Sequence, residues 1–392
     1  MINGHAEPQS NSWDQNAPRP APFRLSPDWN GVRATGRFAS YSKADTWYPS
    51  WGADGALYSP FTDGDVMGIR SWSVGVDATT GHATIHGDDP LDLKIDNIGV
   101  VAASPAPYGG RYPSASLMLD GTWYYGTYCL VETPDRGLNW DVLGPFVGFR
   151  TSTDGGQTWE EGPRTPTDTV FGESVTSGRP IRFGAPHFVD FGRNNEHAPG
   201  GYAYLVGHGS RTSSDQLSWI SGDEIFLART KPTVEGINEP DSWEFYAGLS
   251  GAEPQWSRDL DDAHPIASWP QHMGCVTVTY NAAAKKYLMC VTDGWPTIKE
   301  MDSYILESDS LFGPWKMVAY MENFGQQAYF LNFPSKFISE DGTRAWLSYS
   351  ANFTDTYMYP VMKADPVGSR YSMCLLEIEF QRVEGHDSDR SA

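Results

Sequence analysis

The chain has 392 residues, with 28 Lys and Arg against 49 Asp and Glu, so its formal net charge at pH 7 is −21. This acidic balance argues against nucleic acid and against an anionic membrane surface as partners, because both require a basic face. Charged residues make up only 20% of the chain and hydrophobic residues 40%, which favours a folded protein over an acidic disordered one. No apolar run is long enough to span a bilayer.

Aromatic residues and glycines stand out in the composition, with 15 Trp, 20 Tyr, 18 Phe and 40 Gly. They suit β-strands joined by tight turns, and flat aromatic rings also suit sugar binding. The four cysteines are too scattered for a disulfide framework, so we expect buried thiols, although Cys275 and Cys290 could face each other across a hairpin. Residues 1–22 are polar and lack the apolar core of a signal peptide, which predicts a cytoplasmic protein or one whose leader is absent from this sequence.

In chain order, the sequence predicts a series of β-hairpins and almost no helix. Five of them recur at intervals of roughly 60 to 80 residues, each an apolar strand, a turn with Gly or Asn, and a second apolar strand. They cover residues 46–61, 114–128, 187–206, 274–291 and 334–349. This spacing predicts an all-β fold, a five-bladed β-propeller in which each hairpin is the inner half of one blade.

The two ends of the chain complete the predicted propeller. We predict residues 371–380 as the third strand of the last blade and residues 31–41 as its outer strand. Pairing of these two strands would leave neither with that edge exposed. We therefore predict a polar N-terminal extension over residues 1–30, a single propeller over 31–383 and a disordered tail over 384–392. Residues 152–159 match the Asp-box pattern S-x-D-x-G-x-T-W, which resembles a structural turn of sialidase-like blades.

Propeller geometry gathers candidate site residues that are far apart in the sequence. The innermost strand of each blade begins, and the second strand ends, on the same face near the axis. The residues that fall at these points are Asp45, Asp63, Asp65, Arg111, Tyr112, His187, His208, His272, Asp293, Asn332 and Asn352. Acids, imidazoles, amides and aromatic rings in one funnel are typical of a pocket that cleaves sugars.

Two carboxyl groups carry the predicted chemistry. A glycosidase needs one carboxylic acid to protonate the leaving oxygen and a second carboxylate to attack or to activate water. Asp45 and Asp63 are the leading candidates because both fall at the funnel of the first blade, although each could instead be a cap or turn residue. Asp65 could orient Asp63 or bind a sugar hydroxyl, and Asp293 could orient or tune the pair. Glu173 is a third candidate acid, for which a solvated loop charge is the simpler interpretation.

The remaining candidates are predicted to hold substrate. His187, His208 and His272 suit sugar hydroxyls better than a metal ion, since no short-range ligand spacing supports a metal site. Tyr112 and Asn332 join them as expected sugar-binding residues. Trp47, Trp51 and Trp295 are possible stacking platforms, with core packing the alternative. No cofactor is expected, although a cation in the central channel stays open, and the oligomeric state is not predicted.

Two other functions remain open at this point. A propeller polysaccharide lyase would remove a proton beside a uronate with a His or Tyr, while Arg111 neutralised the carboxylate and Tyr112 or a histidine served as the base. The third possibility is a propeller that binds carbohydrate without cleaving it. Signatures of serine hydrolases and of phosphate-binding loops are missing.

The first predicted blade also resembles a known family. Its residues Ala44-Asp45-Thr46-Trp47-Tyr48-Pro49-Ser50-Trp51, Ala53-Asp54-Gly55, Tyr58 and Thr62-Asp63-Gly64-Asp65 resemble the opening blade of glycoside hydrolase family 183. This family, once known only as a domain of unknown function, includes endo-D-arabinanases that cut arabinofuranose polymers on five-bladed propellers. Looser similarity continues over most of residues 40–350. The resemblance implies a glycosidase whose catalytic acids are aspartates of the first blade, positions that Asp45 and Asp63 occupy here.

Overall fold

The computed structural model describes residues 2–5, 11–75, 77–102, 108, 110–131, 142–212, 217–294, 301–352 and 364–383. Almost all regular structure in these residues is β-strand, as the alternating and short apolar runs predict. The described helices are single 3-10 turns of three residues, and none is long and apolar enough to cross a bilayer. They are η1 (Arg193–Asn195), η2 (Pro199–Gly201), η4 (Pro240–Ser242), η5 (Leu260–Asp262) and η6 (Ser335–Phe337).

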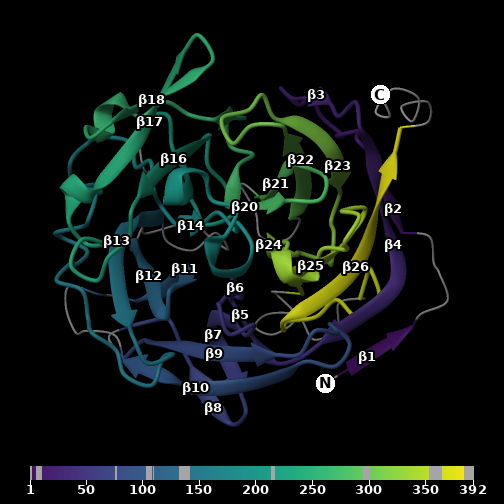
Figure 1. Ribbon diagram of the computed structural model, residues 1–392, viewed down its shortest axis with the longest axis horizontal. Coiled ribbons are helices and arrows are strands. Elements are labelled where there is room, and N and C mark those ends of the chain that lie inside the picture. Colours follow the sequence, from purple (N-terminus) through teal and green to yellow (C-terminus); the bar gives the residue numbers. More distant parts are fainter. Residues whose placement is uncertain are drawn as a thin grey trace.

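The strands form sheets that surround a common axis in a β-propeller arrangement (Figure 1). The first sheet in chain order contains β5 (Lys43–Asp45), β7 (Leu57–Val66), β9 (Thr79–His86) and β10 (Lys94–Ala102), with β6 (Ser50–Trp51) and β8 (Ile69–Ser71) paired to β7. The second contains β11 (Tyr112–Leu119), β12 (Thr122–Val131) and β13 (Val142–Ser152). The third contains β14 (His187–Phe188), β15 (Ala203–Gly209), β16 (Glu224–Thr230), β17 (Trp243–Ser250) and β18 (Glu253–Ser257), with β19 (Ala267–Ser268) paired to β16.

The last two sheets both include strands from the start of the chain. The fourth contains β20 (Gly274–Asn281), β21 (Lys286–Asp293), β22 (Asp302–Ser308), β23 (Lys316–Met321) and, parallel to β23, β3 (Arg24–Leu25). The fifth contains β24 (Tyr329–Asn332), β25 (Arg344–Ser350), β26 (Cys374–Arg382), β4 (Trp29–Ser40) and β1 (Ile2–His5), with β2 (Ser12–Trp13) paired to β4. Four sheets hold four or more strands, as complete propeller blades do, whereas the sheet of β11, β12 and β13 holds three.

The start and the end of the chain are joined in one sheet. β4 pairs with β26 in antiparallel register from Ser40 opposite Cys374 to Trp29 opposite Arg382, so the pairing predicted for residues 31–41 and 371–380 is present. Part of residues 1–30, the segment predicted as a polar extension, also packs against the sheets. The buried Gln15 side chain donates hydrogen bonds to the carbonyls of Ser26 and Met317, which ties that segment to β23. The tail at 384–392 lies outside the described residues.

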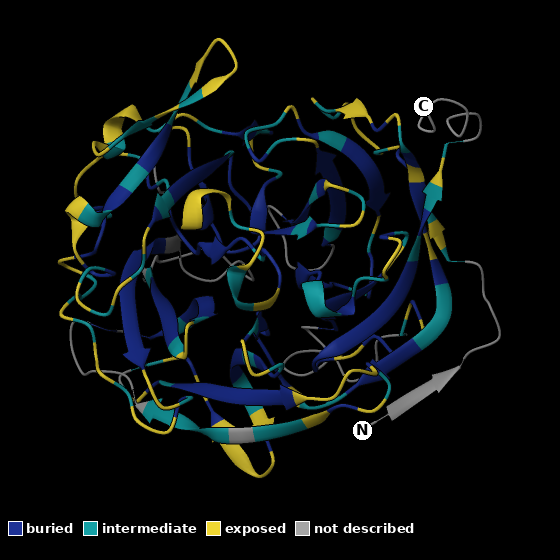
Figure 2. Ribbon diagram, viewed as in Figure 1, coloured by how far each residue is buried: buried dark blue, intermediate teal, exposed yellow. Residues whose placement is uncertain are grey.

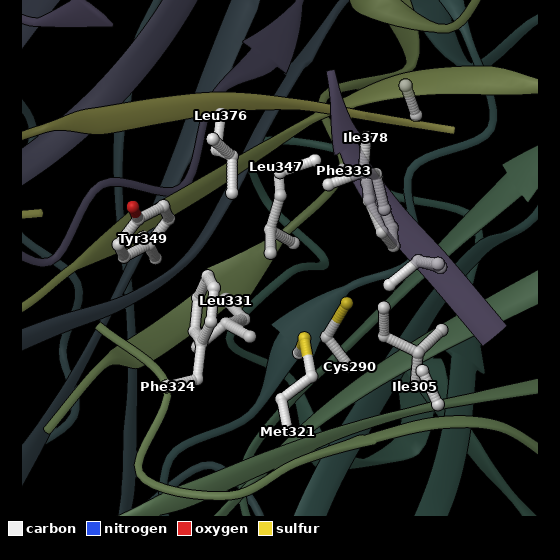
Figure 3. Packing of buried hydrophobic residues seen from close by; sticks show 14 of the residues in the cluster. Cys290, Ile305, Met321, Phe324, Leu331, Phe333, Leu347, Tyr349, Leu376 and Ile378 are labelled. Carbon is white, nitrogen blue, oxygen red and sulfur yellow. The ribbon is translucent and has the colours of Figure 1, made fainter. Parts of the chain in front are cut away.

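Apolar side chains fill the space between neighbouring sheets. Figure 2 shows that the strands around the axis are mostly buried, whereas exposed residues concentrate in the connecting turns. The packing between the fourth and fifth sheets is seen in Figure 3, where Cys290 and Ile305 of one sheet face Leu331 and Leu347 of the other. All four cysteines are buried free thiols, so the alternative of a Cys275–Cys290 pair is wrong. This apolar packing between sheets fixes the positions of the innermost strands that form the candidate site.

Candidate active site

A pocket lies where the starts of the innermost strands converge. It has about 380 Å³ of empty space, part of it open to solvent. The residues that line it come from four of the sheets and their connections, namely Asp45, Thr46, Asp63, Tyr112, Tyr128, Leu130, Trp219, Tyr329 and Phe330. Two carboxyl groups among aromatic rings are the composition that the sequence predicts for the funnel, and Asp45, Asp63 and Tyr112 all reach it.

Asp45 ends β5 and is buried, with only 4% of the residue exposed. Its carboxyl group is surrounded by hydroxyls: Thr46 Oγ1 lies 2.8 Å from Oδ1, and the hydroxyls of Tyr329 and Tyr371 lie 2.9 and 3.0 Å from Oδ2. Burial and the nearby charge of Asp63 raise the pKa of Asp45 to about 8, although the three hydroxyls act in the opposite direction. This shift favours the protonated form of the carboxyl group at neutral pH.

Asp63 lies on the neighbouring strand β7 and is less buried than Asp45. Its carboxylate accepts hydrogen bonds from the backbone N–H of Ser73 at 2.8 Å and from the Ser73 hydroxyl at 2.6 Å. Burial raises the pKa of Asp63, and the two bonds from Ser73 and the charge of Arg70 lower it. The two aspartates titrate as a pair, because the charge of one raises the pKa of the other.

The backbone around the pocket adopts an unusual conformation. Thr46, Asp63 and Phe330 line the pocket and have φ angles of +66°, +50° and +57°. Side chains other than glycine rarely occupy this left-handed region, and such strain persists only where the surrounding structure enforces it. The packing of several sheets therefore holds both aspartates in a fixed arrangement.

A layer of aromatic rings lies next to the pocket, further along the innermost strands. Tyr48 stacks on His187 with ring centroids 3.7 Å apart, and Phe330 meets Tyr48 edge-on at 5.5 Å. His187 is buried, and burial together with the charge of His208 holds the pKa of His187 well below its usual range. His187 lines a second cavity, with Asp190 and Asn332, rather than the aspartate pocket.

Several residues predicted to bind substrate make internal contacts instead. His208 is buried and contacts the carbonyl of Ser218 at 2.9 Å, with a pKa lowered by burial to about 4. Asn332 donates to the carbonyls of Trp47 and Phe330, both at 2.9 Å. These contacts fix Asn332 and the Nε2 side of His208 to neighbouring segments, whereas His208 Nδ1 is buried with no hydrogen-bond partner among the described residues.

Asp65 lies outside the pocket lining. It is exposed, and its carboxylate accepts the backbone N–H of Gly68 at 2.8 Å, which closes the turn between β7 and β8. The alternation along a strand would place Asp65 on the same side as Asp63. The positive φ of Asp63 and the irregular register between β5 and β7 break this alternation.

His272 and Asp293 pair with each other at a distance from the pocket lining. His272 Nδ1 lies 2.7 Å from Asp293 Oδ1, and the Tyr320 hydroxyl lies 2.9 Å from Asp293 Oδ2. The same Tyr320 hydroxyl lies 2.9 Å from Asp302. Asp293 therefore orients His272 and Tyr320 rather than the aspartates of the first sheet.

The other sequence candidates have structural contacts. Arg111 is buried and pairs with Glu161 at 2.8 Å, outside the pocket lining, so the arginine that the lyase hypothesis names is not placed in this pocket. Glu173 is buried and accepts the backbone N–H groups of Arg182 and Phe183, so its interpretation as a solvated loop charge is wrong. Burial raises the pKa of Glu173 to about 7.

Two of the three predicted tryptophan platforms, Trp47 and Trp51, lie outside the pocket lining. Trp47 is fully buried and stacks on Phe61, so it belongs to the core. Trp51 is half-buried and also packs against the core, and Trp295 lies outside the described residues.

Sequence reasoning missed the residues that hold the aspartates. Ser73, Tyr329 and Tyr371 contact Asp45 or Asp63, and Trp219 completes the aromatic lining. Tyr329 stands at the start of β24. The expectation that innermost strands begin near the axis applies to this position as well, so the sequence could have indicated Tyr329 as a pocket residue. Tyr371 carries no such signal because it precedes its strand β26 and contacts Asp45 across 326 positions.

Metal-binding side chains do not cluster in the described ranges. There, no three His, Cys, Asp or Glu residues lie close enough together to hold an ion. The carboxyl pair of Asp45 and Asp63 is the arrangement that the described pocket offers for chemistry.

Comparison with known proteins supports the fold alone. No family model and no curated protein sequence matches the chain. Among solved structures, a Bacteroides ovatus ATCC 8483 protein with a provisional hydrolase assignment is similar, with a TM-score of 0.50, 13% identity and coverage of 97% of this chain and 99% of that one. Weaker likeness is found to an α-L-arabinofuranosidase from Podospora anserina in complex with cellotriose, with a TM-score of 0.44, 11% identity and coverage of 87% and 91%. A GH43_1 enzyme from Xanthomonas citri is also similar, with a TM-score of 0.46, 13% identity and coverage of 88% of this chain and 89% of that one.

Proposed function

We propose that this protein is a glycoside hydrolase that cleaves a polysaccharide or oligosaccharide in the pocket of Asp45 and Asp63. The proposal depends on one observation: two carboxyl groups on adjacent strands share a pocket, and their hydrogen-bond partners differ in kind. Glycosidases need such a difference, because one carboxyl must carry a proton while the other is ionised.

Asp45 is the proposed general acid. Its neighbours are hydroxyl groups, which can accept a hydrogen bond as well as donate one. The Tyr371 hydroxyl also lies 3.0 Å from the carbonyl of Asp63, so it can donate there while accepting the proton of Asp45. With its pKa at about 8, Asp45 is protonated at neutral pH and can donate to the leaving glycosidic oxygen.

Asp63 is the proposed nucleophile or base. One of its partners is the backbone N–H of Ser73, which can only donate and therefore favours the ionised carboxylate. An ionised Asp63 either attacks the anomeric carbon or removes a proton from the attacking water. In the first case water then releases the sugar from Asp63, and Asp45 accepts the proton of that water.

The aromatic lining suits a sugar ring. Tyr112 and Tyr128 lie nearly parallel, with centroids 5.3 Å apart, and Trp219 meets Tyr329 edge-on at 5.2 Å. These rings offer flat apolar faces beside the carboxyl pair. Together with the resemblance of the first blade to the endo-D-arabinanase family, they support an arabinofuranose-containing glycan as the substrate. We count the three-stranded sheet of β11, β12 and β13 as a fifth blade, as that family would have.

A screen over furanose and uronate polysaccharides, with product detection by mass, tests the proposal. We expect hydrolysis products that are 18 mass units heavier per cleavage than the unsaturated products of a lyase, which would also absorb in the ultraviolet. Asp45→Asn and Asp63→Asn should each abolish cleavage, and Glu173→Gln serves as the matched control because that buried carboxyl lies outside the pocket lining. Cleavage that survives in both aspartate variants would refute the proposal, as would binding of glycans without any cleavage.

A further inference from the structure

A hairpin extends from the pocket across the first sheet. It runs from Gly64 on β7 through β8 to Val74, and we call residues 64–74 the rim hairpin. Met67 and Gly68 form its turn, with φ angles of +54° and +81°, as in the type I′ turns that connect two-residue hairpins. In the view of Figure 1, β8 lies at the outer edge of the molecule beyond β10, while Ser73 at the other end of the hairpin contacts the pocket residue Asp63.

The rim hairpin exposes several apolar side chains next to the exposed Arg70. Ser71 and Ser73 are buried, whereas the alternate residues Trp72 and Val74 are 36% and 40% exposed. Ile69 is 41% exposed as well, and Met67 at the turn is 67% exposed. Four of the seven large hydrophobic residues that are exposed in the described part of the chain therefore belong to this one hairpin. Exposed apolar residues that gather on one segment mark a binding site more often than apolar residues scattered singly over the surface.

The rim hairpin is connected directly to the carboxyl pair. Ser73, between Trp72 and Val74, provides both hydrogen bonds to the Asp63 carboxylate. The Arg70 guanidinium lies 5.1 Å from the centre of the Trp72 ring and restrains it. The exposed ring therefore stands one residue away from the group that positions Asp63.

We infer that Trp72 and Val74 form an outer subsite, which binds a neutral sugar unit of the same glycan chain that is cleaved at Asp45 and Asp63. The inference rests on the proposed function. A polymer whose bond lies in the pocket must leave it over the rim, and the C–H faces of a sugar ring pack well on an indole. The net charge of −21 disfavours a polyanionic chain, which leaves a neutral one as the fitting occupant.

Replacement of Trp72 tests this subsite. In Trp72→Ala we expect the KM for a polymeric arabinan to rise about tenfold more than the KM for a 4-nitrophenyl arabinofuranoside, because only the polymer reaches the rim hairpin. Trp72→Phe should restore most of the loss, since it keeps a flat ring. Leu249→Ala is the matched control, because Leu249 is an exposed apolar residue, 53% accessible, on the hairpin of β17 and β18.

Binding can be measured apart from cleavage. In an Asp45→Asn background, migration through a native gel that contains arabinan should be retarded, and Trp72→Ala should remove most of that retardation. Equal polymer KM and equal retardation with and without Trp72 would overturn the subsite while leaving the proposed function intact. A rim hairpin that served a second copy of this chain would instead show in sedimentation velocity as a dimer that Trp72→Ala dissociates, and this result with an unchanged KM would also overturn it. Cleavage that persists in Asp45→Asn would count against the proposed function itself.

Discussion

Two aspartates near the propeller axis differ in the kind of group that surrounds their carboxyls: Asp45, which is buried, and Asp190, which is partly buried and follows β14. Asp190 accepts the backbone N–H groups of Gly192 and Ser335, at 2.9 and 2.7 Å, and the Ser335 hydroxyl at 2.7 Å. Asp45 contacts only hydroxyls. Burial raises the pKa of both groups. A backbone N–H can only donate a hydrogen bond, so it favours an ionised carboxylate. A hydroxyl can also turn and accept a hydrogen bond, so it can serve a protonated carboxyl as well.

This difference separates a structural aspartate from a reactive one. Asp190 joins the third sheet to the 3-10 turn η6 that follows β24, and its carboxylate is fixed by donors that would be left unpaired if it were protonated or removed. Asp45 has partners for both protonation states, and Asp63 lies next to it. Asp63 combines the two patterns, with one backbone donor and one hydroxyl, both from Ser73. From Asp45 through Asp63 to Asp190, the number of backbone N–H donors to the carboxyl rises from none to one to two, and with it the preference for the ionised form.

The largest expected effect is the loss of activity on removal of either pocket carboxyl. Asp45→Asn and Asp63→Asn should each lower kcat by about a thousandfold or more, because no described pocket residue offers a second acid or base. Asp190→Asn should leave kcat within about twofold of the wild type. Steady-state kinetics on the substrate found by the screen, with circular dichroism as a check of folding, measures both. A loss of kcat in Asp190→Asn with an intact fold would contradict the comparison.

The second prediction concerns stability at Asp190. Asp190→Ala leaves two buried backbone N–H groups and a hydroxyl without their acceptor, so the free energy of unfolding should fall by about 3 kcal/mol. Urea unfolding at pH 7 measures this change. The control is Asp154→Ala, in a turn where the carboxylate also accepts several hydrogen bonds but is exposed to water, and there the loss should be clearly smaller, because water can replace the lost acceptor.

The third prediction uses the raised pKa of Asp45. Between the unfolded pKa of about 3.9 and the folded pKa of about 8, the folded protein binds more protons than the unfolded chain, so this group lowers stability as pH rises through that range. Asp45→Asn has no proton to lose. Its melting temperature should therefore match that of the wild type near pH 4 and exceed it increasingly up to pH 8. Scanning calorimetry from pH 4 to 8 measures the difference, and a gap that shrinks with rising pH would show that Asp45 is ionised in the fold.

The sequence predicts the sheets and the carboxyl pair better than it predicts the surroundings of the pair. Asp45 and Asp63 follow from their positions at the start of the innermost predicted strand and at the end of the second, because propeller geometry brings these points near the axis. His187 and His208 satisfy the same rule, yet both are buried in internal contacts. Position along a strand determines which face of the propeller a residue approaches, but side-chain direction and depth depend on packing between sheets that strand position alone does not encode.

The hydrogen bonds to the two aspartates could not be predicted from the sequence for a related reason. Tyr371 meets Asp45 because β26 and β4 close the last sheet, and Ser73 meets Asp63 because the rim hairpin folds back on β7. Neither residue belongs to a motif, and each finds its partner only after the backbone is complete. The same holds for Asp65, whose exposed position follows from the positive φ of Asp63 and not from any feature of residue type.

The smallest expected effect comes from the hydroxyl of Ser73. Ser73→Ala removes the hydroxyl donor to Asp63 and keeps the backbone N–H donor. Asp63 then loses one of the two hydrogen bonds that favour its ionised form. Because the Ser73 hydroxyl lowers the pKa of Asp63, its loss should move the acidic limb of the kcat/KM profile to higher pH. We expect the loss of kcat/KM to be larger on the acidic limb of the profile than above it, where Asp63 is ionised in both proteins. Ser71→Ala on the same hairpin is the control, since the Ser71 hydroxyl contacts Thr62 and Thr79 and not a carboxylate. An equal loss on the acidic limb and above it would mean that Ser73 positions Asp63 without influencing its charge.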